Sequence, residues 1–490
     1  MRKSGILLPV FSLPSNQATG TLGKGAYDFI DFLSAAGQKV WQVLPLCPAD
    51  YTNSPYQSVS CFAGNPLFID FSLLLKDGLI RNTDIPVADT SKERADYKLA
   101  KEQSRAVLSR AFENFKEEDF KEEYANFLIK NRFWINDFAL YSAIKEEFGG
   151  VSWKDFPALL KDRDPAALKE FSNSHRERIN YHIFVQFIFM RQWTALKSYA
   201  DRKGVEIFGD MPIYAAYDSA DVWAHRKCFM LCSDGSPALI SGTPPDAFSE
   251  DGQVWGSPLY DFPYMESLEE PYYWWVNRIK HALLMYDTVR IDHFRAFESF
   301  FAIPSEDKTA KNGRWIKGPG KKIFDCFDKS IGKNLPIVAE DLGIITGEVK
   351  DLLLYTGFAG MRVLEFGFDG NPDNPYLPHN FVRNTVAYIG THDNETLMQF
   401  SNTHPEEALR LKNYIGKTSE ALNWATVRLL MTSVADTVIF TMQDIMGTGK
   451  DTRINTPATV KNNWEWRMDA SCPNSWLAGI IKEFTETYGR

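Results

Sequence analysis

Cysteine is scarce in this chain of 490 residues, and the six cysteines that it has are scattered. None of them forms a CxxC pair, and Cys228 and Cys232, four positions apart, have no second pair of possible metal ligands near them. This spacing argues against a structural zinc site and against a framework of disulfides. Isolated cysteines suit a reducing compartment, so we expect a cytoplasmic protein. The six are Cys47, Cys61, Cys228, Cys232, Cys326 and Cys472.

Long apolar runs and an excess of basic residues are missing as well. The first apolar run, residues 6–11, is interrupted by Pro9 and is too short for a signal peptide or a membrane anchor. The formal net charge is −9, and the basic stretches are short and broken by acids. A nucleic-acid partner would need a basic face. We therefore expect neither a nucleic-acid nor a membrane partner, whereas a neutral substrate fits.

Motifs for metals and nucleotides are absent from the sequence. There is no HExxH helix and no His-rich ligand set, and no P-loop or GxGxxG follows a predicted strand. The sequence therefore predicts no metal and no organic cofactor.

Aromatic residues, in contrast, are abundant, with 13 Trp, 20 Tyr and 35 Phe. Most aromatic side chains in proteins are simply buried, and a thick aromatic core is the simpler interpretation. The alternative is that some rings stack on the faces of sugars.

Eight short apolar or β-branched runs read as strands, and near-continuous apolar runs are typical of parallel strands that are covered on both faces. Helical spacing fills most gaps, as in residues 27–36, which end at Gly37, and in residues 272–285 and 348–354. Eight such units predict an α/β fold, a closed (β/α)8 TIM barrel, with a doubly wound sheet as the alternative. The runs are residues 5–10, 39–46, 205–213, 287–291, 335–338, 361–366, 385–389 and 436–440.

One gap is too long for a simple crossover. Residues 72–198 are rich in helix formers and charge and predict a mainly helical insertion at the C-terminal face, in which residues 115–121 would be a solvated helix face. We expect one elaborated catalytic domain over residues 1–490, with no separate C-terminal β-sandwich, because only about fifty residues follow the last strand.

Acidic residues stand at the ends of four predicted strands. In a β/α barrel, the carboxyl ends of the strands form the active site. For a single Asp the alternative role is a helix N-cap, and Asp341 and Asn394 are candidates for such caps. Clustered buried carboxylates cost free energy, which favours a functional role for the set. The residues are Asp210, then Asp292 with His293, then Glu340 with Asp341, and His392 with Asp393.

Two carboxylates that flank a bond are what glycoside cleavage requires: one acts as the acid and the other as nucleophile or base. A third carboxylate can orient the hydroxyl groups of the sugar. For a retaining pair, we expect the carboxyl groups of residues 292 and 340 to lie about 5–5.5 Å apart.

At this point the motifs become recognisable as a set. They are SPYQSVSCFAGNP (54–66), FGDMPIY (208–214), GTPPDAFSEDGQVWGSPLY (242–260), RIDHFR (290–295), NGRWIKGPG (312–320), AEDLG (339–343), THDNET (391–396), MQDIMGTG (442–449) and RINTPATVKNNWEWR (453–467). In this order they resemble the amylomaltases, or disproportionating 4-α-glucanotransferases, of the α-amylase clan. The resemblance covers essentially the whole chain.

The resemblance implies roles for individual residues. Asp292 matches the nucleophile, Glu340 the general acid/base, and Asp393 the acid that grips sugar hydroxyls and stabilises the transition state. Arg290 matches the guanidinium that holds the nucleophile ionised, and we expect it to lower the pKa of Asp292, whereas the setting of Glu340 should raise its pKa. His293 and His392 match sugar-binding histidines, although a buried core histidine is the alternative for each.

Further sugar contacts follow from the same resemblance. Residues 242–260 match a flexible active-site loop, although Phe248 and Trp255 could instead only pack within it. Ser257 and Ala296 depart from the expected Asn and Gly, which affects no catalytic position. The implied substrate-binding residues are Tyr56, Asp210, Asp246, Phe248, Gln253, Trp255, Asp369 and Asn463.

The implied reaction is a retaining transfer of part of an α-1,4-glucan to the 4-hydroxyl of glucose or a maltooligosaccharide. Two alternatives stay open: an α-glucan hydrolase of the same clan, and a non-catalytic glucan-binding protein. The latter would have lost a catalytic carboxylate, and none is lost here. The oligomeric state does not follow from the sequence.

Overall fold

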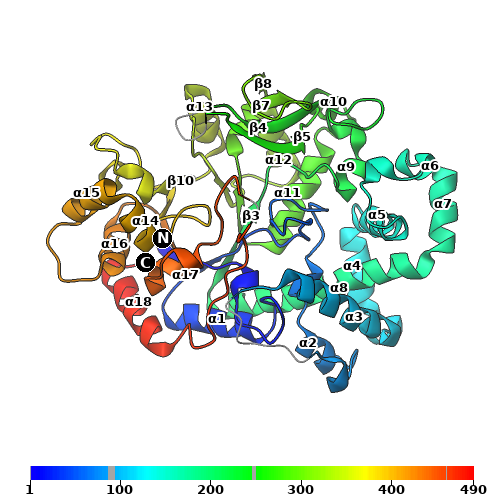
Figure 1. The fold of residues 1–490 in the computed structure, drawn as a ribbon, viewed down its shortest axis with the longest axis horizontal. Coiled ribbons are helices and arrows are strands. Elements are labelled where there is room, and N and C mark those ends of the chain that lie inside the picture. Colours follow the sequence, from blue (N-terminus) through cyan, green and yellow to red (C-terminus); the bar gives the residue numbers. More distant parts are fainter. Residues whose placement is uncertain (1, 87–93, 246–249, 460) are drawn as a thin grey trace.

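The computed structural model describes residues 2–86, 94–245, 250–459 and 461–490 (Figure 1). Its centre is one sheet of eight parallel strands in the order β10-β11-β12-β1-β2-β3-β6-β9. A parallel bridge between Val338 and Ala359 joins the two ends of this order and closes the barrel. The strands are β1 (Lys3–Leu7), β2 (Val40–Gln42), β3 (Glu206–Met211), β6 (Thr288–Ile291), β9 (Ile337–Ala339), β10 (Gly360–Val363), β11 (Thr385–Tyr388) and β12 (Thr437–Thr441).

Each of these strands coincides with one of the eight apolar runs, so the predicted barrel is confirmed and the doubly wound sheet is excluded. All residues of β2, β9, β11 and β12 are buried, as expected for parallel strands enclosed by helices. Gly5 shows how closely the strands approach, because a Cβ at this position would lie 2.4 Å from the carbonyl oxygen of Val40 on the neighbouring strand.

Helices surround the barrel where helical spacing predicted them. Helix α1 (Lys24–Ala35) is followed by Gly37 in the left-handed conformation, and α11 (Tyr273–Met285) and α13 (Gly347–Thr356) match the other two predictions. The remaining helices outside residues 72–198 are α9 (Ala220–Ala224), α10 (Phe262–Glu266), α12 (Lys321–Ser330), α14 (Leu397–Thr403), α15 (Pro405–Ile415), α16 (Leu422–Thr432), α17 (Met442–Met446) and α18 (Ser475–Tyr488).

A group of helices lies between β2 and β3 and occupies the right side of Figure 1. Its longest member, α8, docks on the segment after β2 through two glutamines. Gln186 makes hydrogen bonds with the backbone N–H and C=O of Gly64, and Gln192 makes the same pair with Asp70. The helices are α2 (Phe71–Lys76), α3 (Tyr97–Asn114), α4 (Lys121–Asn131), α5 (Ile135–Glu147), α6 (Ala158–Lys161), α7 (Pro165–Ser174) and α8 (Arg176–Lys203).

Many aromatic side chains form the core of these helices. Phe115 contacts Phe184 and Phe187 with ring centroids 4.9 and 6.0 Å apart, and Tyr124 meets Phe187 edge to face. The acids of residues 115–121 are exposed beside them on a short 3-10 helix, Glu117–Phe120. Most of this aromatic content therefore serves packing.

A second sheet, which the sequence did not predict, lies at the top of Figure 1. It is antiparallel, in the order β5-β4-β7-β8, with β4 (Leu239–Thr243), β5 (Gln253–Pro258), β7 (Ser299–Pro304) and β8 (Arg314–Lys317). Residues 242–243 and 253–258 of the segment 242–260, expected as a flexible loop, therefore belong to paired strands. The pairing of β4 with β7 joins residues about sixty positions apart, which local patterns do not reveal.

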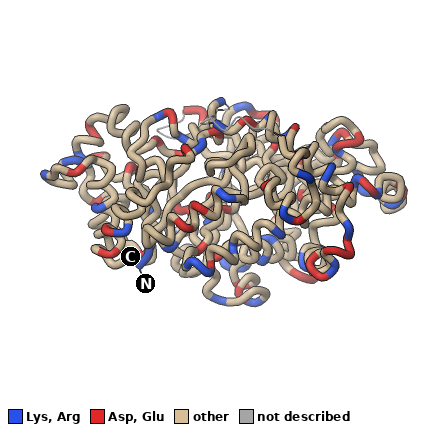
Figure 2. Tube along the Cα trace, turned by 90° about the horizontal axis from the view of Figure 1, so that it is seen from below, with Lys and Arg blue, Asp and Glu red and all other residues tan. Residues whose placement is uncertain are grey.

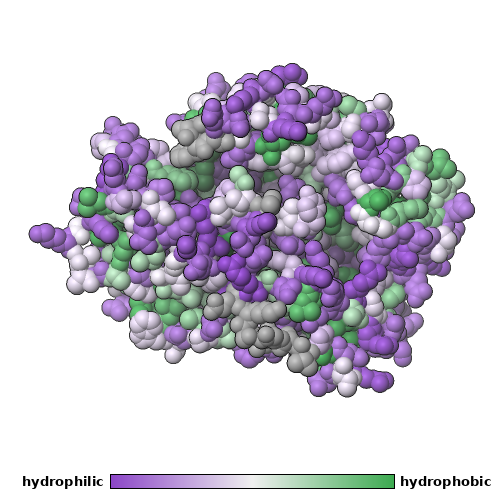
Figure 3. Space-filling view, viewed as in Figure 1, coloured by the Kyte–Doolittle hydropathy of each residue, from purple (hydrophilic) through white to green (hydrophobic). Residues whose placement is uncertain are grey.

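Acidic and basic residues are interleaved along the chain (Figure 2). The face seen in Figure 3 is hollowed towards its centre, and hydrophilic residues border the hollow. Among the described residues, no helix combines the length and the apolar character needed to span a bilayer.

Candidate active site

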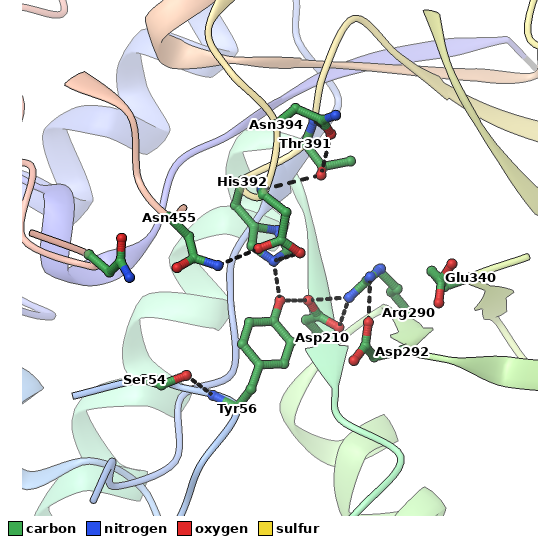
Figure 4. A network of polar contacts seen from close by, with 12 residues as sticks. Ser54, Tyr56, Asp210, Arg290, Asp292, Glu340, Thr391, His392, Asn394 and Asn455 are labelled. Atoms are coloured by element: carbon green, nitrogen blue, oxygen red, sulfur yellow. Dashed lines mark hydrogen bonds and ion pairs between the residues drawn. The ribbon is translucent and has the colours of Figure 1, made fainter. Parts of the chain in front are cut away.

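The carboxyl ends of the barrel strands bring the predicted acids together. Asp210 lies within β3, Asp292 directly follows β6, and Glu340 directly follows β9. Asp393 lies five residues beyond the end of β11. Figure 4 shows Asp210, Asp292 and Glu340 around Arg290.

Arg290 holds two of the carboxylates. Its Nη1 donates to both oxygens of Asp210 at 2.8 Å, and its Nη2 donates to Oδ1 of Asp292 at 2.6 Å. Arg290 and Asp292 are two residues apart at the end of one strand and so point to the same side. The side chains of Arg290 and Asp210 are 5% and 0% exposed, so this pair is removed from water. Asp210 and Arg290 thus form a rigid floor below Asp292.

The pKa of Asp292 departs from the expectation. Burial raises it, and Arg290 opposes the rise without cancelling it, while the charges of Asp210 and Asp393 add to the rise. The sequence analysis considered Arg290 alone, and its expectation of a net lowering is wrong. Because 31% of the Asp292 side chain remains exposed, its carboxylate is open to the cleft.

Glu340 is held by two backbone N–H groups. Its Oε2 accepts from His293 and its Oε1 from Leu342, both at 2.7 Å. His293 has a φ of 53°, in the left-handed region that non-glycine residues seldom adopt. The carboxyl group of Glu340 thus hydrogen-bonds the backbone of the residue directly after Asp292.

The pKa of Glu340 is raised to about 7, first by burial and then by the charge of Asp292. The direction agrees with the expectation. A carboxyl group with a pKa near neutrality can both donate and accept a proton at physiological pH.

Asp393 is fixed by three groups. His392 Nε2 lies 3.2 Å from its Oδ2, Asn455 Nδ2 donates to its Oδ1 at 2.6 Å, and Arg453 Nη2 donates to its backbone oxygen at 2.9 Å. Burial acts to raise the pKa of Asp393, but His392 and Asn455 outweigh it and hold this pKa well below its usual range. Asp393 is therefore an ionised acceptor.

Tyr56 connects the two sides of the site. Its hydroxyl donates to Asp210 Oδ2 at 2.6 Å and lies 2.8 Å from His392 Nε2. Because the Tyr56 hydroxyl donates its proton to the hydrogen bond with Asp210, it can only accept from His392. Nε2 of His392 must therefore carry a proton, which it shares between Tyr56 and Asp393. The Tyr56 and His392 rings also stack, with centroids 5.2 Å apart and planes at 14°.

His293 lines the side of the site next to the second sheet. Trp255, on β5, packs edge to face against the His293 ring, with ring centroids 4.8 Å apart. Gln253 accepts a hydrogen bond from Trp255 Nε1 at 3.1 Å. Burial lowers the pKa of His293 to about 3, and Arg295 adds to the effect, so its imidazole is neutral.

The other predicted sugar contacts have different surroundings. Asp246 and Phe248 lie outside the described residues. Asp369 is exposed after β10 and accepts the backbone N–H of Asn371 at 2.8 Å. The amide of Asn463 accepts from the backbone N–H of Thr456 and donates to Thr459, so it binds within its own loop.

Arg453 and Asn455 are contacts that the sequence analysis did not identify. They lie in the segment after α17, far from any strand end, so the rule that located the acids could not find them. Their motif, RINTPATVKNNWEWR, was the only signal. Among the described residues, no group of three or more His, Cys, Asp or Glu is arranged to hold a metal ion.

Comparison with known proteins gives consistent matches. The family model for 4-alpha-glucanotransferase, glycoside hydrolase family 77, matches residues 8–472. The 4-alpha-glucanotransferase of Clostridium butyricum is 42% identical over 487 residues, which cover 98% of this chain and 99% of the relative. That of Thermus thermophilus is 42% identical over 479 residues, or 95% of each chain.

Solved structures of two amylomaltases have the same fold as this chain. The amylomaltase from Streptococcus agalactiae in complex with acarbose superposes with a TM-score of 0.95 at 39% identity, over 100% of both chains. The amylomaltase from Corynebacterium glutamicum, at 18% identity and a TM-score of 0.74, shares the fold and covers 98% of this chain and 73% of its own.

Proposed function

The chain belongs to the 4-alpha-glucanotransferase family and is an enzyme of that activity, acting on α-glucans, and from this premise we propose that Asp292, Glu340 and Asp393 carry out the transfer. The observation that carries the proposal is the contrast between two carboxyl groups on adjacent strand ends. Asp292 is paired with Arg290 and open to the cleft, whereas Glu340 has a pKa of about 7.

In the first step, Asp292 attacks the anomeric carbon of the donor glucan and Glu340 protonates the leaving oxygen. The bond from the anomeric carbon to the leaving sugar breaks, and an ester to Asp292 forms. Arg290 keeps Asp292 ionised for this attack, because its second guanidinium nitrogen is directed at Oδ1. Asp393, ionised and held by His392 and Asn455, binds hydroxyl groups of the reacting sugar most strongly in the transition state.

In the second step, Glu340 takes the proton from the 4-hydroxyl of an acceptor, glucose or a maltooligosaccharide. The acceptor oxygen then displaces Asp292 from the anomeric carbon. Two inversions give net retention. The proximity needed here, about 5–5.5 Å between the carboxyl groups of Asp292 and Glu340, stays a prediction.

Transfer exceeds hydrolysis when the acceptor sugar is bound well and water is poorly placed. Trp255 and the neutral imidazole of His293 provide an apolar wall beside Glu340, the side from which an acceptor must approach. We assign Gln253 and Trp255 to the acceptor side, whereas Tyr56, Asp210, His392, Asp369 and Asn463 stay predicted sugar contacts. Asp246 and Phe248 stay predicted acceptor contacts, and a cytoplasmic location without membrane or nucleic-acid partners remains part of the proposal.

The test is incubation with maltotriose and chromatography of the products. A ladder of shorter and longer maltooligosaccharides supports transfer, whereas glucose and maltose without longer products would indicate hydrolysis. Asp292→Asn should abolish turnover while glucan binding survives; activity retained by this variant would exclude Asp292 as the nucleophile.

A further inference from the structure

We propose that Arg453 and Asn455 are positioning residues for Asp393, which orient its carboxylate towards the reacting sugar. This inference rests on the proposed role of Asp393. It concerns two residues that form no hydrogen bond or ion pair with Asp292, Glu340 or Arg290 in the described part of the chain.

Asp393 needs an external support. It lies five residues beyond β11, on a loop, and 44% of its side chain is exposed. Neighbouring side chains therefore do not fix its rotamer by packing, in contrast to Asp210, which is fully buried. A group that stabilises a transition state must be held close to its productive geometry before the substrate arrives.

Asn455 supplies half of that support. Its Nδ2 donates to Oδ1 of Asp393 at 2.6 Å, while His392 Nε2 lies 3.2 Å from Oδ2. The two donors act on different oxygens, and Asn455 lies on the side of His392 that faces away from Arg290 (Figure 4). Donors on both oxygens fix the plane of the carboxylate as well as its position.

Arg453 links the backbone of Asn455 to the backbone of Asp393. Its Nε donates to the carbonyl oxygen of Asn455 at 2.7 Å and its Nη2 to the carbonyl oxygen of Asp393 at 2.9 Å. The Nη1 lies 3.5 Å from Oε1 of Glu395. Because the guanidinium is planar and its donors form a rigid fork, the segment carrying Asn455 and the loop carrying Asp393 are held in one relative placement.

The segment that carries Arg453 and Asn455 is closed by a backbone hydrogen bond of its own. Trp464 N–H donates to the carbonyl oxygen of Ile454 at 2.7 Å, and the amide of Asn463 binds within the turn between them. The Trp464 ring lies 5.8 Å from that of Tyr56 and 6.0 Å from that of His392. This orange-red segment crosses the face of the barrel in Figure 1. It therefore packs against the side of the site that Tyr56 and His392 form.

The alternative is that both residues only anchor the segment to the barrel. A double-mutant cycle separates the two roles, with Asn455→Ala, Asp393→Asn and the double variant, and with Lys461→Ala, an exposed residue of the same segment, as the control. The measurement is the dissociation constant of acarbose by calorimetry, which does not depend on turnover, together with kcat and KM for maltotriose where activity remains.

We expect Asn455→Ala to weaken acarbose binding and to lower kcat roughly ten- to hundred-fold, as for a lost hydrogen bond to a charged group, with KM within about twofold. In the Asp393→Asn background the same substitution should change acarbose binding less than about twofold. An equal loss in both backgrounds would overturn the proposal. Wild-type enzyme that forms no maltooligosaccharide ladder would instead overturn the proposed function, which is a separate outcome.

Arg453 gives an independent test. An ammonium group cannot reach both carbonyl oxygens in the geometry of the guanidinium, so Arg453→Lys should lower kcat several-fold and leave KM and the melting temperature near those of the Lys461→Ala control. A variant with unchanged kcat, or one in which only KM rises, would refute the positioning role of Arg453.

Discussion

Removing the charge of Asp210 tests whether the floor of the site is held by the buried ion pair. In Asp210→Asn, Arg290 keeps its hydrogen bond to the carboxylate of Asp292, and Tyr56 loses a charged acceptor. Breaking a buried pair by neutralising one partner costs about 3–5 kcal/mol. The exposures of 5% and 0% mean that solvent hardly screens this pair. Since Asp292 still compensates part of the charge, we expect the lower end, a loss of about 3 kcal/mol in the free energy of unfolding.

The assay is urea denaturation of the wild type, Asp210→Asn and Asp119→Asn, in which the same chemical change is made at an exposed residue. The control should unfold within about 0.5 kcal/mol of the wild type. Activity should fall together with stability, because an Arg290 freed from Asp210 can turn towards Asp292 and bind both of its oxygens. If Asp210→Asn unfolds like the control, the buried pair does not organise the floor, and the explanation given for the placement of Asp292 fails.

Three further predictions follow from the contacts around Glu340, His293 and Tyr56. The raised pKa of Glu340, about 7, makes its protonated form the stable one in the folded enzyme, so kcat/KM should fall as the pH rises through about 7. For the same reason the wild type should lose about 1–3 kcal/mol of stability relative to Glu340→Gln between pH 4 and pH 8, and the variant should lack activity at both. At His293, whose φ is 53°, glycine should give a protein about 1 kcal/mol more stable than alanine in thermal unfolding, although both variants lose the imidazole; equal stability would show that the left-handed backbone is not strained. Tyr56→Phe removes the hydroxyl that joins Asp210 to His392, so kcat should fall about tenfold with the melting temperature little changed; wild-type kcat would contradict a role for this bridge.

The barrel was predictable because each of its strands can be recognised from its own short stretch of sequence. A run such as TVIFT in β12 is buried at every position, and its composition reveals this without any knowledge of its partners. The acids were predictable for the same reason, since a barrel places its active site where such runs end. Asp210, Asp292 and Glu340 needed no more than this rule, and the resemblance assigned their roles.

The second sheet and the support of Asp393 could not be predicted in this way. Strand β8 is exposed at three of its four positions and has no apolar pattern. Asn455 lies outside the strand ends that located the acids, so only the folded chain reveals its contact with Asp393. The pKa of Asp292 was misjudged for a related reason, because burial and the charges of Asp210 and Asp393 depend on contacts between distant segments.

The hydroxyl of Tyr56 links the two sides of the cleft through hydrogen bonds. A continuous chain of polar contacts runs from Asp210 through this oxygen and His392 to Asp393, across segments far apart in sequence. Substitutions on either side will therefore combine non-additively, and attempts to redesign the donor side must treat these residues as a block. Trp255 and Gln253, which are hydrogen-bonded to each other, stand outside this network in the described chain, so the acceptor side can be changed without altering it.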